Sequence, residues 1–247
     1  LWIRGQSEDY NIWRQLGNTG WGWNDVLPYF LKSENNELGK GEFHNDSGPI
    51  TVANKKINLK LLDEFQNAAE EYGIPKTNDF NTGDNTGIGF FQFTTSFNKP
   101  GLKLRCSAAK GYLNPAKKRS NLKIVVNAHV QKINFEGKKA IGASYYNGDK
   151  LIEVKADKEV ILSSGAIGSP HILQVSGIGN KEKLKKLGID IIHESNGVGL
   201  NLQDHLMFRP VYKVKNLKSL NRKVESIFGR FMMGLEYILN QSGPVTM

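Results

Sequence analysis

Residues 160–179 read VILSSGAIGSPHILQVSGIG, and this stretch constrains the structure more than any other part of the chain. The apolar run Val160–Leu162 predicts a short strand that is buried on both faces. Gly165 and Gly168 follow the run, and glycine lets a chain turn sharply and approach a ligand closely. The stretch therefore predicts a strand that ends in a glycine turn.

A helix is expected directly after that turn. Ser169 suits a helix N-cap and Pro170 the first helical turn, while Gly177 and Gly179 end the apolar segment that follows. A strand, a glycine turn and a helix N-terminus together are typical of a nucleotide-binding edge. An ordinary strand-to-helix turn has the same pattern, so the spacing alone leaves both interpretations open.

Short strands are expected on the N-terminal side of this stretch. Asn147-Gly148 is a strong signal for a two-residue hairpin turn, and residues 136–138 predict another turn. The expected strands of this β-meander cover residues 122–126, 130–135, 140–146, 151–156 and 159–163.

Hydrophobic periodicity places the remaining elements. Helices are expected at residues 58–72, 107–113 and 226–239. Further strands are expected at residues 48–53, 89–95, 189–193 and 211–215.

The composition is that of an ordinary globular protein, with 39% hydrophobic and 23% charged residues among 247. No apolar run approaches the roughly 20 residues of a membrane span. Cys106 is the only cysteine, so it has no partner for an internal disulfide, and we expect a buried structural thiol.

The net charge of +9 is compatible with an anionic partner such as nucleic acid. The lysines within residues 181–186 flank Leu184, however, which predicts the solvated face of a short helix. No nucleic-acid-binding motif accompanies them, and no nucleic-acid partner is expected.

The stretch 160–179 also resembles the second signature of the glucose–methanol–choline (GMC) oxidoreductases, a family that uses FAD. That signature places small residues before Ser-Pro, then two aliphatic residues, then Ser-Gly-aliphatic-Gly. The matching residues in this sequence are Gly168, Ser169, Pro170, Ile172, Leu173, Ser176, Gly177, Ile178 and Gly179.

Three further segments resemble the family in the same order. Residues 1–31 are similar to the stretch after the family's first signature, and residues 101–113 to its central block. Residues 197–205, GVGLNLQDH, are similar to the loop that closes the family's N-terminal region. The resemblance is nearest to the insect-type glucose dehydrogenases, which pass electrons to a quinone-like acceptor.

The resemblance implies an α/β fold, with a Rossmann-like FAD-binding domain that carries an inserted β-meander and part of an antiparallel substrate-binding domain. Residues 1–210 would belong to the FAD-binding region, without its first βαβ unit, and residues 211–247 would begin the substrate-binding region. The implied cofactor is FAD, and the implied reaction is oxidation of an alcohol or sugar hydroxyl by hydride transfer to flavin. The family's catalytic histidine is expected beyond Met247, so this fragment alone is expected to be inactive and to bind FAD weakly.

The resemblance also assigns cofactor contacts. Val130 is expected to bind the adenine edge through its main-chain N–H and C=O, although a plain strand residue has the same sequence pattern. Gly165 and Ala166 are expected near the ribose or pyrophosphate, since close main-chain approach needs small residues. The residues expected close to the flavin ring are Leu1, Trp2, Arg4 and Gly5.

Several other interpretations stay open. The aromatic residues within 1–40 are interpreted as core packing or as a wall beside the flavin ring. No metal site is expected, because the five histidines are scattered without ligand spacing. Asp204 and His205 are interpreted as structural rather than as a general base, with Asp204 and Asn201 satisfying loop main-chain groups. The main alternative to an enzyme with an alcohol substrate and an electron acceptor is an inactive relative that binds partners.

Overall fold

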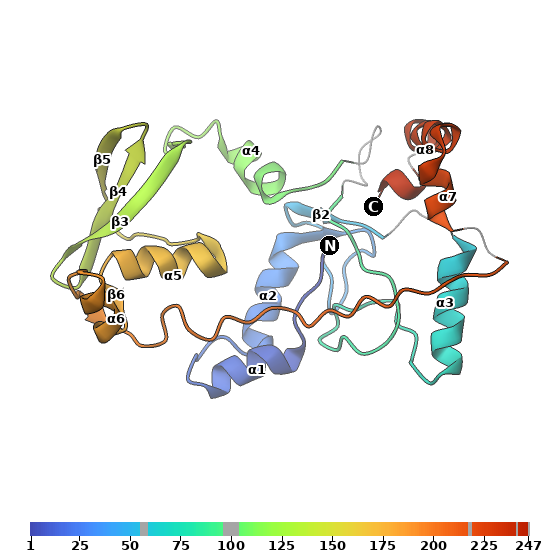
Figure 1. Cartoon of the computed structure of the whole chain (residues 1–247), viewed down its shortest axis with the longest axis horizontal. Coiled ribbons are helices and arrows are strands. Elements are labelled where there is room, and N and C mark those ends of the chain that lie inside the picture. The colour runs from blue at the N-terminus through green and yellow to red at the C-terminus, as the bar shows by residue number, and fades with distance from the viewer. Residues whose placement is uncertain (55–58, 96–103, 217–218, 241, 247) are drawn as a thin grey trace. The chain divides into compact units, whose positions relative to one another are not determined.

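The computed structural model of the chain describes residues 1–54, 59–95, 104–216, 219–240 and 242–246. The chain divides into two compact units, Leu1–Leu122 with Tyr212–Met247 (unit 1) and Lys123–Val211 (unit 2). Figure 1 labels the helices and strands of both units.

Unit 1 combines helices with one short parallel strand pair. The helices are α1 (Ser7–Gln15), α2 (Trp23–Ser33), α3 (Lys60–Glu71), a π-helix (Ala109–Leu113), α4 (Asn114–Ala116), α7 (Leu220–Glu225), α8 (Ile227–Asn240) and a 3-10 helix (Pro244–Thr246). β1 (Glu34–Asn36) follows α2 directly and pairs with β2 (Ile50–Val52). The helices expected near residues 58–72, 107–113 and 226–239 are present, as is the strand expected at 48–53.

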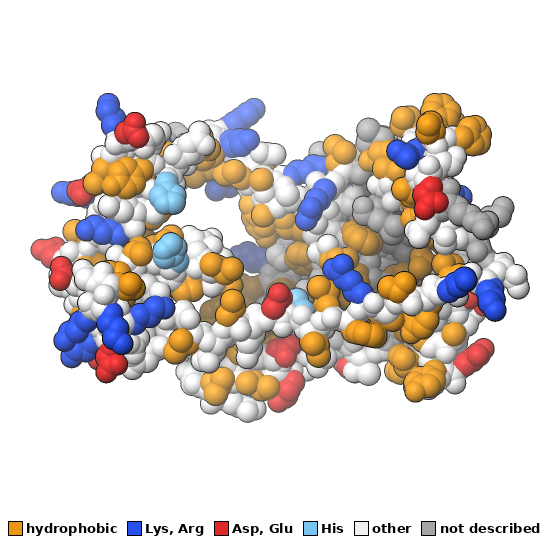
Figure 2. Space-filling model, in the orientation of Figure 1, with side chains coloured by type: hydrophobic (Ala, Val, Ile, Leu, Met, Phe, Trp, Pro, Cys, Tyr) orange, Lys and Arg blue, Asp and Glu red, His pale blue; other side chains and the backbone are white. Residues whose placement is uncertain are grey.

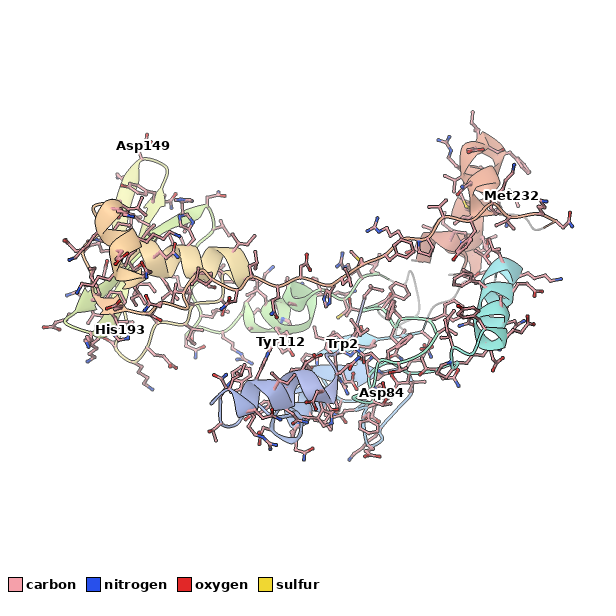
Figure 3. The ribbon with its side chains drawn as sticks, turned by 60° about the horizontal axis from the view of Figure 1, so that its bottom comes forward. Trp2, Asp84, Tyr112, Asp149, His193 and Met232 are labelled. Atoms are coloured by element: carbon pink, nitrogen blue, oxygen red, sulfur yellow. The ribbon has the colours of Figure 1, made fainter. Side chains whose placement is uncertain are left out.

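The apolar core of unit 1 is small. Ile50, Val52 and Cys106 form its buried cluster, and Trp2 packs against them. Cys106 is 4% exposed, which confirms the expected buried thiol. Many apolar side chains remain on the surface, and Figure 2 shows them gathered over α8, from which the exposed Met232 projects in Figure 3.

Unit 2 contains a three-stranded antiparallel sheet in the order β3–β4–β5. Its strands are β3 (Ala128–Glu136), β4 (Lys139–Asn147) and β5 (Lys150–Lys155). Both connections are two-residue turns in which glycine has a positive φ, +57° at Gly137 and +60° at Gly148. The expected hairpin forms, but its two turn residues are Gly148 and Asp149, one residue later than the expected Asn147-Gly148, because Asn147 pairs with Lys150. Asp149 marks the tip of this turn in Figure 3.

α5 (Gly165–Val175) packs along β3. A hydrogen bond joins the two, because Ser176 Oγ accepts from the Ile133 N–H at 2.9 Å. The helix ends at Val175 with Ser176 as its C-cap, and the next residue, Gly177, has the positive φ (+87°) expected of a helix-ending glycine.

β6 (Ile178–Gly179) and β7 (His193–Glu194) pair in parallel, with α6 (Lys181–Lys186) between them in sequence. Leu184 of α6 is fully buried, while the lysines of the helix lie exposed around it (Figure 2). This confirms that the lysine cluster is the solvated face of a short helix.

Replacing Ser176 by alanine is expected to cost about 1–3 kcal/mol of stability, because the buried Ile133 N–H loses its acceptor. Urea-induced unfolding of the intact protein measures the effect. Ser195→Ala, a partly exposed serine of the same unit, is the matched control and is expected to stay near wild type. Equal stabilities of the two variants would contradict the assignment.

Several expected strands do not form. Residues 122–126 and 159–163 have no ladder partner, and Ile161 is 78% exposed. A strand buried on both faces needs neighbouring strands to satisfy its main-chain groups, and no described strand of this chain lies beside Val160–Leu162. The strand expected at 89–95 is reduced to isolated bridges, the one at 189–193 to β7, and residues 211–215 form none.

The start of α5 also differs from the expectation. The helix begins at Gly165 with Ser164 as its N-cap, well before the expected cap, Ser169. The Ser169 hydroxyl instead accepts from the Ser164 N–H at 3.0 Å. Pro170 lies inside the helix, and because it has no N–H, the carbonyl of Ala166 lacks its usual helical donor.

Candidate functional site

The first candidate region in unit 2 is the N-terminus of α5. Gly165 has a φ of +79°, and a Cβ at this position would meet no atom within 4 Å. Both Gly165 and Ala166 are exposed. The first four N–H groups of a helix have no partner inside it and form the positive end of its dipole. Together with the Ala166 carbonyl, this helix start presents several donors and one acceptor to a polar ligand.

The second region is the open edge of β3, since only one side of this strand pairs with β4. The Ile133 N–H points to the open edge, because it donates to Ser176 of the packed helix rather than to β4. Ile133 opposes Ala143 in the register. Antiparallel ladders alternate between hydrogen-bonded and non-hydrogen-bonded pairs. Because the Ile133 N–H donates outside the ladder, Ile133 and Ala143 form a non-hydrogen-bonded pair, in which the main-chain groups point away from the partner strand.

Val130 lies farther along the same edge, opposite Tyr145. Tyr145 and Ala143 are two residues apart on a part of β4 that pairs regularly with β5, so both have the same orientation toward β3. A β-bulge at Gln131 supplies the extra residue on β3. The register therefore turns the main-chain N–H and C=O of Val130 toward the open edge, where its side chain is 38% exposed.

A groove of about 510 Å³ separates α5 from the loop 197–202, and Ala166 and Ser169 line its helical side. Gln174 Nε2 donates to the Val198 carbonyl at 3.0 Å and ties this loop to the helix. Gly199 has a φ of +78°, and any side chain there would collide with Gln174. Glycine in this loop therefore allows the main chain to approach α5 closely.

In unit 1, the side chains of the N-terminal segment alternate in exposure. Leu1 is 64% exposed and Ile3 is 42% exposed, whereas Arg4 is 3% exposed. Trp2 is partly buried, and its Nε1 donates to Glu34 Oε2 at 2.8 Å. The segment therefore has an outward side with Leu1 and Ile3 and an inward side with Trp2 and Arg4.

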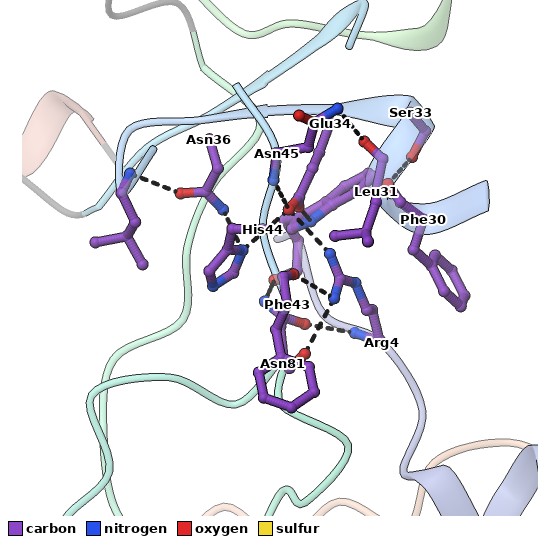
Figure 4. Close-up of polar contacts among 12 residues, drawn as sticks. Arg4, Phe30, Leu31, Ser33, Glu34, Asn36, Phe43, His44, Asn45 and Asn81 are labelled. Carbon is purple, nitrogen blue, oxygen red and sulfur yellow. Dashed lines mark hydrogen bonds and ion pairs between the residues drawn. The ribbon is translucent and has the colours of Figure 1, made fainter. Parts of the chain in front are cut away.

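An ionic cluster is formed by four charged residues on the inward side of this segment, Arg4, Glu34, His44 and Asp79. Figure 4 shows part of this cluster. Glu34 Oε1 lies 3.0 Å from an Arg4 guanidinium nitrogen and 3.0 Å from His44 Nδ1. His44 Nε2 lies 2.8 Å from Asp79 Oδ2. The two cations and two carboxylates balance, as buried charges must.

Neighbouring groups complete the surroundings of Arg4. Its guanidinium donates to the carbonyls of Phe43 (2.7 Å) and Asn81 (3.1 Å) and lies 5.5 Å from the centre of the Phe30 ring. The Nε of Arg4 is buried without a hydrogen-bond partner. The Nη2 of Arg4 contacts Glu34 as an ion pair and not as an aligned hydrogen bond. The Arg4 side chain is thus held inside unit 1.

The pKa values in the cluster depend on both burial and partners. Burial alone lowers the pKa of His44, but the hydrogen bonds and charges of Asp79 and Glu34 raise it to about 9. Burial alone raises the pKa of Glu34, but His44 and Arg4 hold it below its ordinary value. His44 is therefore an imidazolium at neutral pH, and the approach of Asn36 Nδ2 to Nδ1 (3.0 Å) is a close contact rather than a hydrogen bond.

Residues of the expected site are found in both units. Val130, Gly165 and Ala166 belong to unit 2, and the expected flavin neighbours Leu1, Trp2, Arg4 and Gly5 belong to unit 1. Sequence reasoning missed Glu34, His44 and Asp79. These partners lie far apart in sequence and share no motif, so the sequence contains no signal for them.

The aromatic residues within 1–40 are only partly buried. Trp23 is 9% exposed, whereas Trp13 (46%) and Trp21 (54%) lie beside a groove of about 750 Å³ on α1 and α2. The Tyr10 ring packs between Trp13 and Trp23, with its centre 5.4 Å from that of Trp13 and 5.8 Å from that of Trp23. Neither interpretation of the aromatic set is decided by this arrangement.

Two further expectations concern histidines. Within the described ranges, no group of histidine, cysteine and acidic residues is arranged to hold a metal ion. The His205 N–H donates to Asp204 Oδ1 at 2.7 Å, as expected for a carboxylate that satisfies loop main-chain groups.

In the part of the chain that the structure describes, no helix combines the length and apolar character needed to cross a bilayer.

Comparison with known proteins gives a consistent answer. A family model described as GMC oxidoreductase matches residues 1–207. The oxygen-dependent choline dehydrogenase of Pectobacterium atrosepticum is 38% identical over 98% of this chain and 43% of its own length. The mitochondrial choline dehydrogenase of Homo sapiens is 42% identical over 83% of this chain and 34% of its own length. An FAD-dependent oxidoreductase from Chaetomium thermophilum superposes with a TM-score of 0.86 at 31% identity, over 99% of this chain and 44% of that protein.

The chain therefore belongs to the GMC oxidoreductase family, which confirms the resemblance found in the sequence. The mixed α/β fold of the FAD-binding members is confirmed with it. The chain spans less than half the length of the curated relatives it matches.

Proposed function

We propose that this chain is part of an FAD-dependent enzyme that oxidises a CH–OH group, with choline as the first candidate substrate. The observation that carries the proposal is 38% identity to an oxygen-dependent choline dehydrogenase over nearly the whole chain. Bound flavin would supply the hydride acceptor. The residues described above would bind and orient that cofactor, whereas the family's catalytic histidine is expected outside this chain.

The geometry of unit 2 fits a dinucleotide. The unpaired donors at Gly165 and Ala166 suit a pyrophosphate, and the helix dipole favours its negative charge. The main-chain N–H and C=O of Val130 face the open edge of β3 and suit the donor and acceptor pattern of an adenine edge. These three residues are our proposed contacts to the adenosine half of FAD.

The finer architecture is part of the same proposal. Residues 122–126 and 160–162 would be strand positions of a Rossmann-like sheet, with the β3–β4–β5 meander inserted between them. Their partner strands would come from parts of the protein outside this chain. Residues 1–210 would serve FAD binding, and residues 211–247 would begin the substrate-binding region.

The test uses the intact protein under anaerobic conditions. It is expected to be yellow, and its flavin absorbance is expected to bleach when choline is added. Glucose, added separately, tests the likeness to glucose dehydrogenases, which stays a prediction. Bound flavin that no alcohol or sugar bleaches would instead favour the inactive relative, and a protein without flavin would contradict the proposal altogether.

A further inference from the structure

One buried carboxylate holds the N-terminal segment in place. Glu34 is fully buried, and its two oxygens contact the indole of Trp2, the guanidinium of Arg4 and the imidazole of His44. The Asn45 N–H also donates to Oε1 at 3.1 Å. The partners come from two separate segments, residues 2–4 and 44–45, so Glu34 fixes their relative positions.

Hydrogen bonds also hold the main chain of the same segment. The Trp2 N–H donates to the Gln92 carbonyl at 2.8 Å, and the Arg4 N–H donates to Asn81 Oδ1 at 2.8 Å. Asn85 Nδ2 donates to the Arg4 carbonyl at 3.2 Å. A main-chain bridge to Gln92 thus holds Trp2, and two side-chain amides hold Arg4, so the alternation of inward and outward side chains is fixed.

We propose that Glu34 is a positioning residue for the flavin, and that Leu1 and Ile3, rather than Trp2 and Arg4, turn their side chains toward the flavin ring. The inference rests on the proposed function and on the family resemblance, which implies that residues 1–5 lie close to that ring. The resemblance assigned Trp2 and Arg4 to the flavin ring, but the polar groups of both side chains bond to other residues inside the protein. Glu34 acts at a distance, by holding the inward side so that the outward side is presented in one register.

The first experiment removes a single donor to Glu34. Trp2→Phe keeps an aromatic ring but deletes the Nε1–H, and Tyr72→Phe, which deletes the hydroxyl of an exposed tyrosine outside the ionic cluster, is its control. We expect Trp2→Phe to slow flavin reduction by choline about 10-fold, with KM changed less than about twofold, because small misplacements at a reacting centre are costly. Tyr72→Phe is expected to leave both values within about twofold of wild type.

A double-mutant cycle separates positioning from direct contact. If Trp2 acts through Glu34, Trp2→Phe combined with Glu34→Gln is expected to reduce flavin no more slowly than Glu34→Gln alone. Rate losses that multiply in the double variant would overturn the role assigned to Glu34. Equal rates for Trp2→Phe and Tyr72→Phe would overturn it as well.

A second pair of variants tests the outward side and does not depend on the folding of a Glu34 variant. Ile3→Ser and Ile12→Ser change the same residue type at the same 42% exposure in unit 1. The absorbance maximum of the bound flavin is expected to shift in Ile3→Ser only. Identical spectra for the two variants would overturn the assignment of Ile3.

The outcomes also separate this inference from the proposed function. A wild-type protein that holds flavin but is reduced by no alcohol would contradict the proposed reaction, while the spectral comparison still tests the contacts of Ile3. A wild-type protein that is reduced by choline, with Ile3→Ser and Ile12→Ser alike, would contradict the inference alone.

Discussion

Replacing Glu34 by glutamine is expected to destabilise the intact protein by about 3–5 kcal/mol, the usual cost of removing one partner from a buried ion pair. The substitution preserves the size of the side chain but leaves Arg4 and His44 buried with Asp79 as the remaining carboxylate of the ionic cluster. The two carboxylate oxygens have different partners, the Trp2 indole at Oε2 and Arg4, His44 and the Asn45 N–H at Oε1, and glutamine keeps only one oxygen. With that oxygen on the side of the two cations, the Trp2 indole loses its acceptor, so the loss combines charge with one hydrogen bond. Urea-induced unfolding followed by tryptophan fluorescence measures it.

Glu64→Gln is the matched control. Glu64 lies on α3 and contacts Lys60 at 3.9 Å, and both side chains are largely exposed. Exposed pairs of this kind contribute about 0.3–0.5 kcal/mol, so the control is expected to change stability little. A Glu34→Gln protein as stable as Glu64→Gln would show that the cluster does not stabilise unit 1.

The elements that the sequence predicted well are those with local signals. The β4–β5 hairpin follows from Asn147-Gly148, because only the turn residues and their nearest neighbours determine it. The helix α8 follows from periodicity within one segment. Both are specified by residues that are close together in the chain, and both were predicted within a few residues of their bounds.

The strand expected at Val160–Leu162 shows the limit of that reasoning. Its apolar side chains fit a central strand, but a strand exists only with a partner, and pairing is a property of two segments. The helix start shows a different limit. Ser169 has the chemistry of an N-cap, yet Gly165 permits a positive φ that lets the helix begin earlier, and Ser169 then bonds back to Ser164.

The candidate site divides in the same way. Gly165 and Ala166 were identifiable because a glycine turn before a helix is a local pattern with a physical meaning. Glu34, His44 and Asp79 were not, because each is an ordinary polar residue until the fold brings it to the others. Arg4 was identified through the family resemblance, but its inward orientation appears only in the structure.

The stability of the protein is expected to fall as the pH rises from about 6.5 to about 9, through the loss of the His44 proton. The pKa of His44 is about 9 in the folded chain, because Asp79 and Glu34 outweigh the opposing effect of burial. Its unfolded value is about 6.5. A folded pKa above the unfolded one gives stability that is complete below pH 6.5 and lost through pH 9, here about 3 kcal/mol.

Ionisation of the two carboxylates of the cluster changes stability with pH in the opposite direction. The pKa values of Glu34 and Asp79 are lowered in the folded chain, despite burial, by hydrogen bonds and charge from His44 and by the charge of Arg4. Their contribution is therefore complete above their ordinary values, near 4.5 and 3.8, and is lost as the pH falls through the folded values. The cluster stabilises most between about pH 4.5 and 6.5.

Unfolding midpoints in urea, measured from pH 4 to pH 9.5, test both the loss of stability at low pH and the loss at high pH. His44→Asn removes the imidazolium, so the variant is expected to be less stable than wild type at pH 6 and to lose most of the decline between pH 6.5 and 9. His171→Asn, at an exposed histidine on α5, is the matched control and is expected to keep that decline. If His44→Asn also keeps it, the alkaline loss arises elsewhere, and His44 does not carry the charge that its two carboxylate neighbours require.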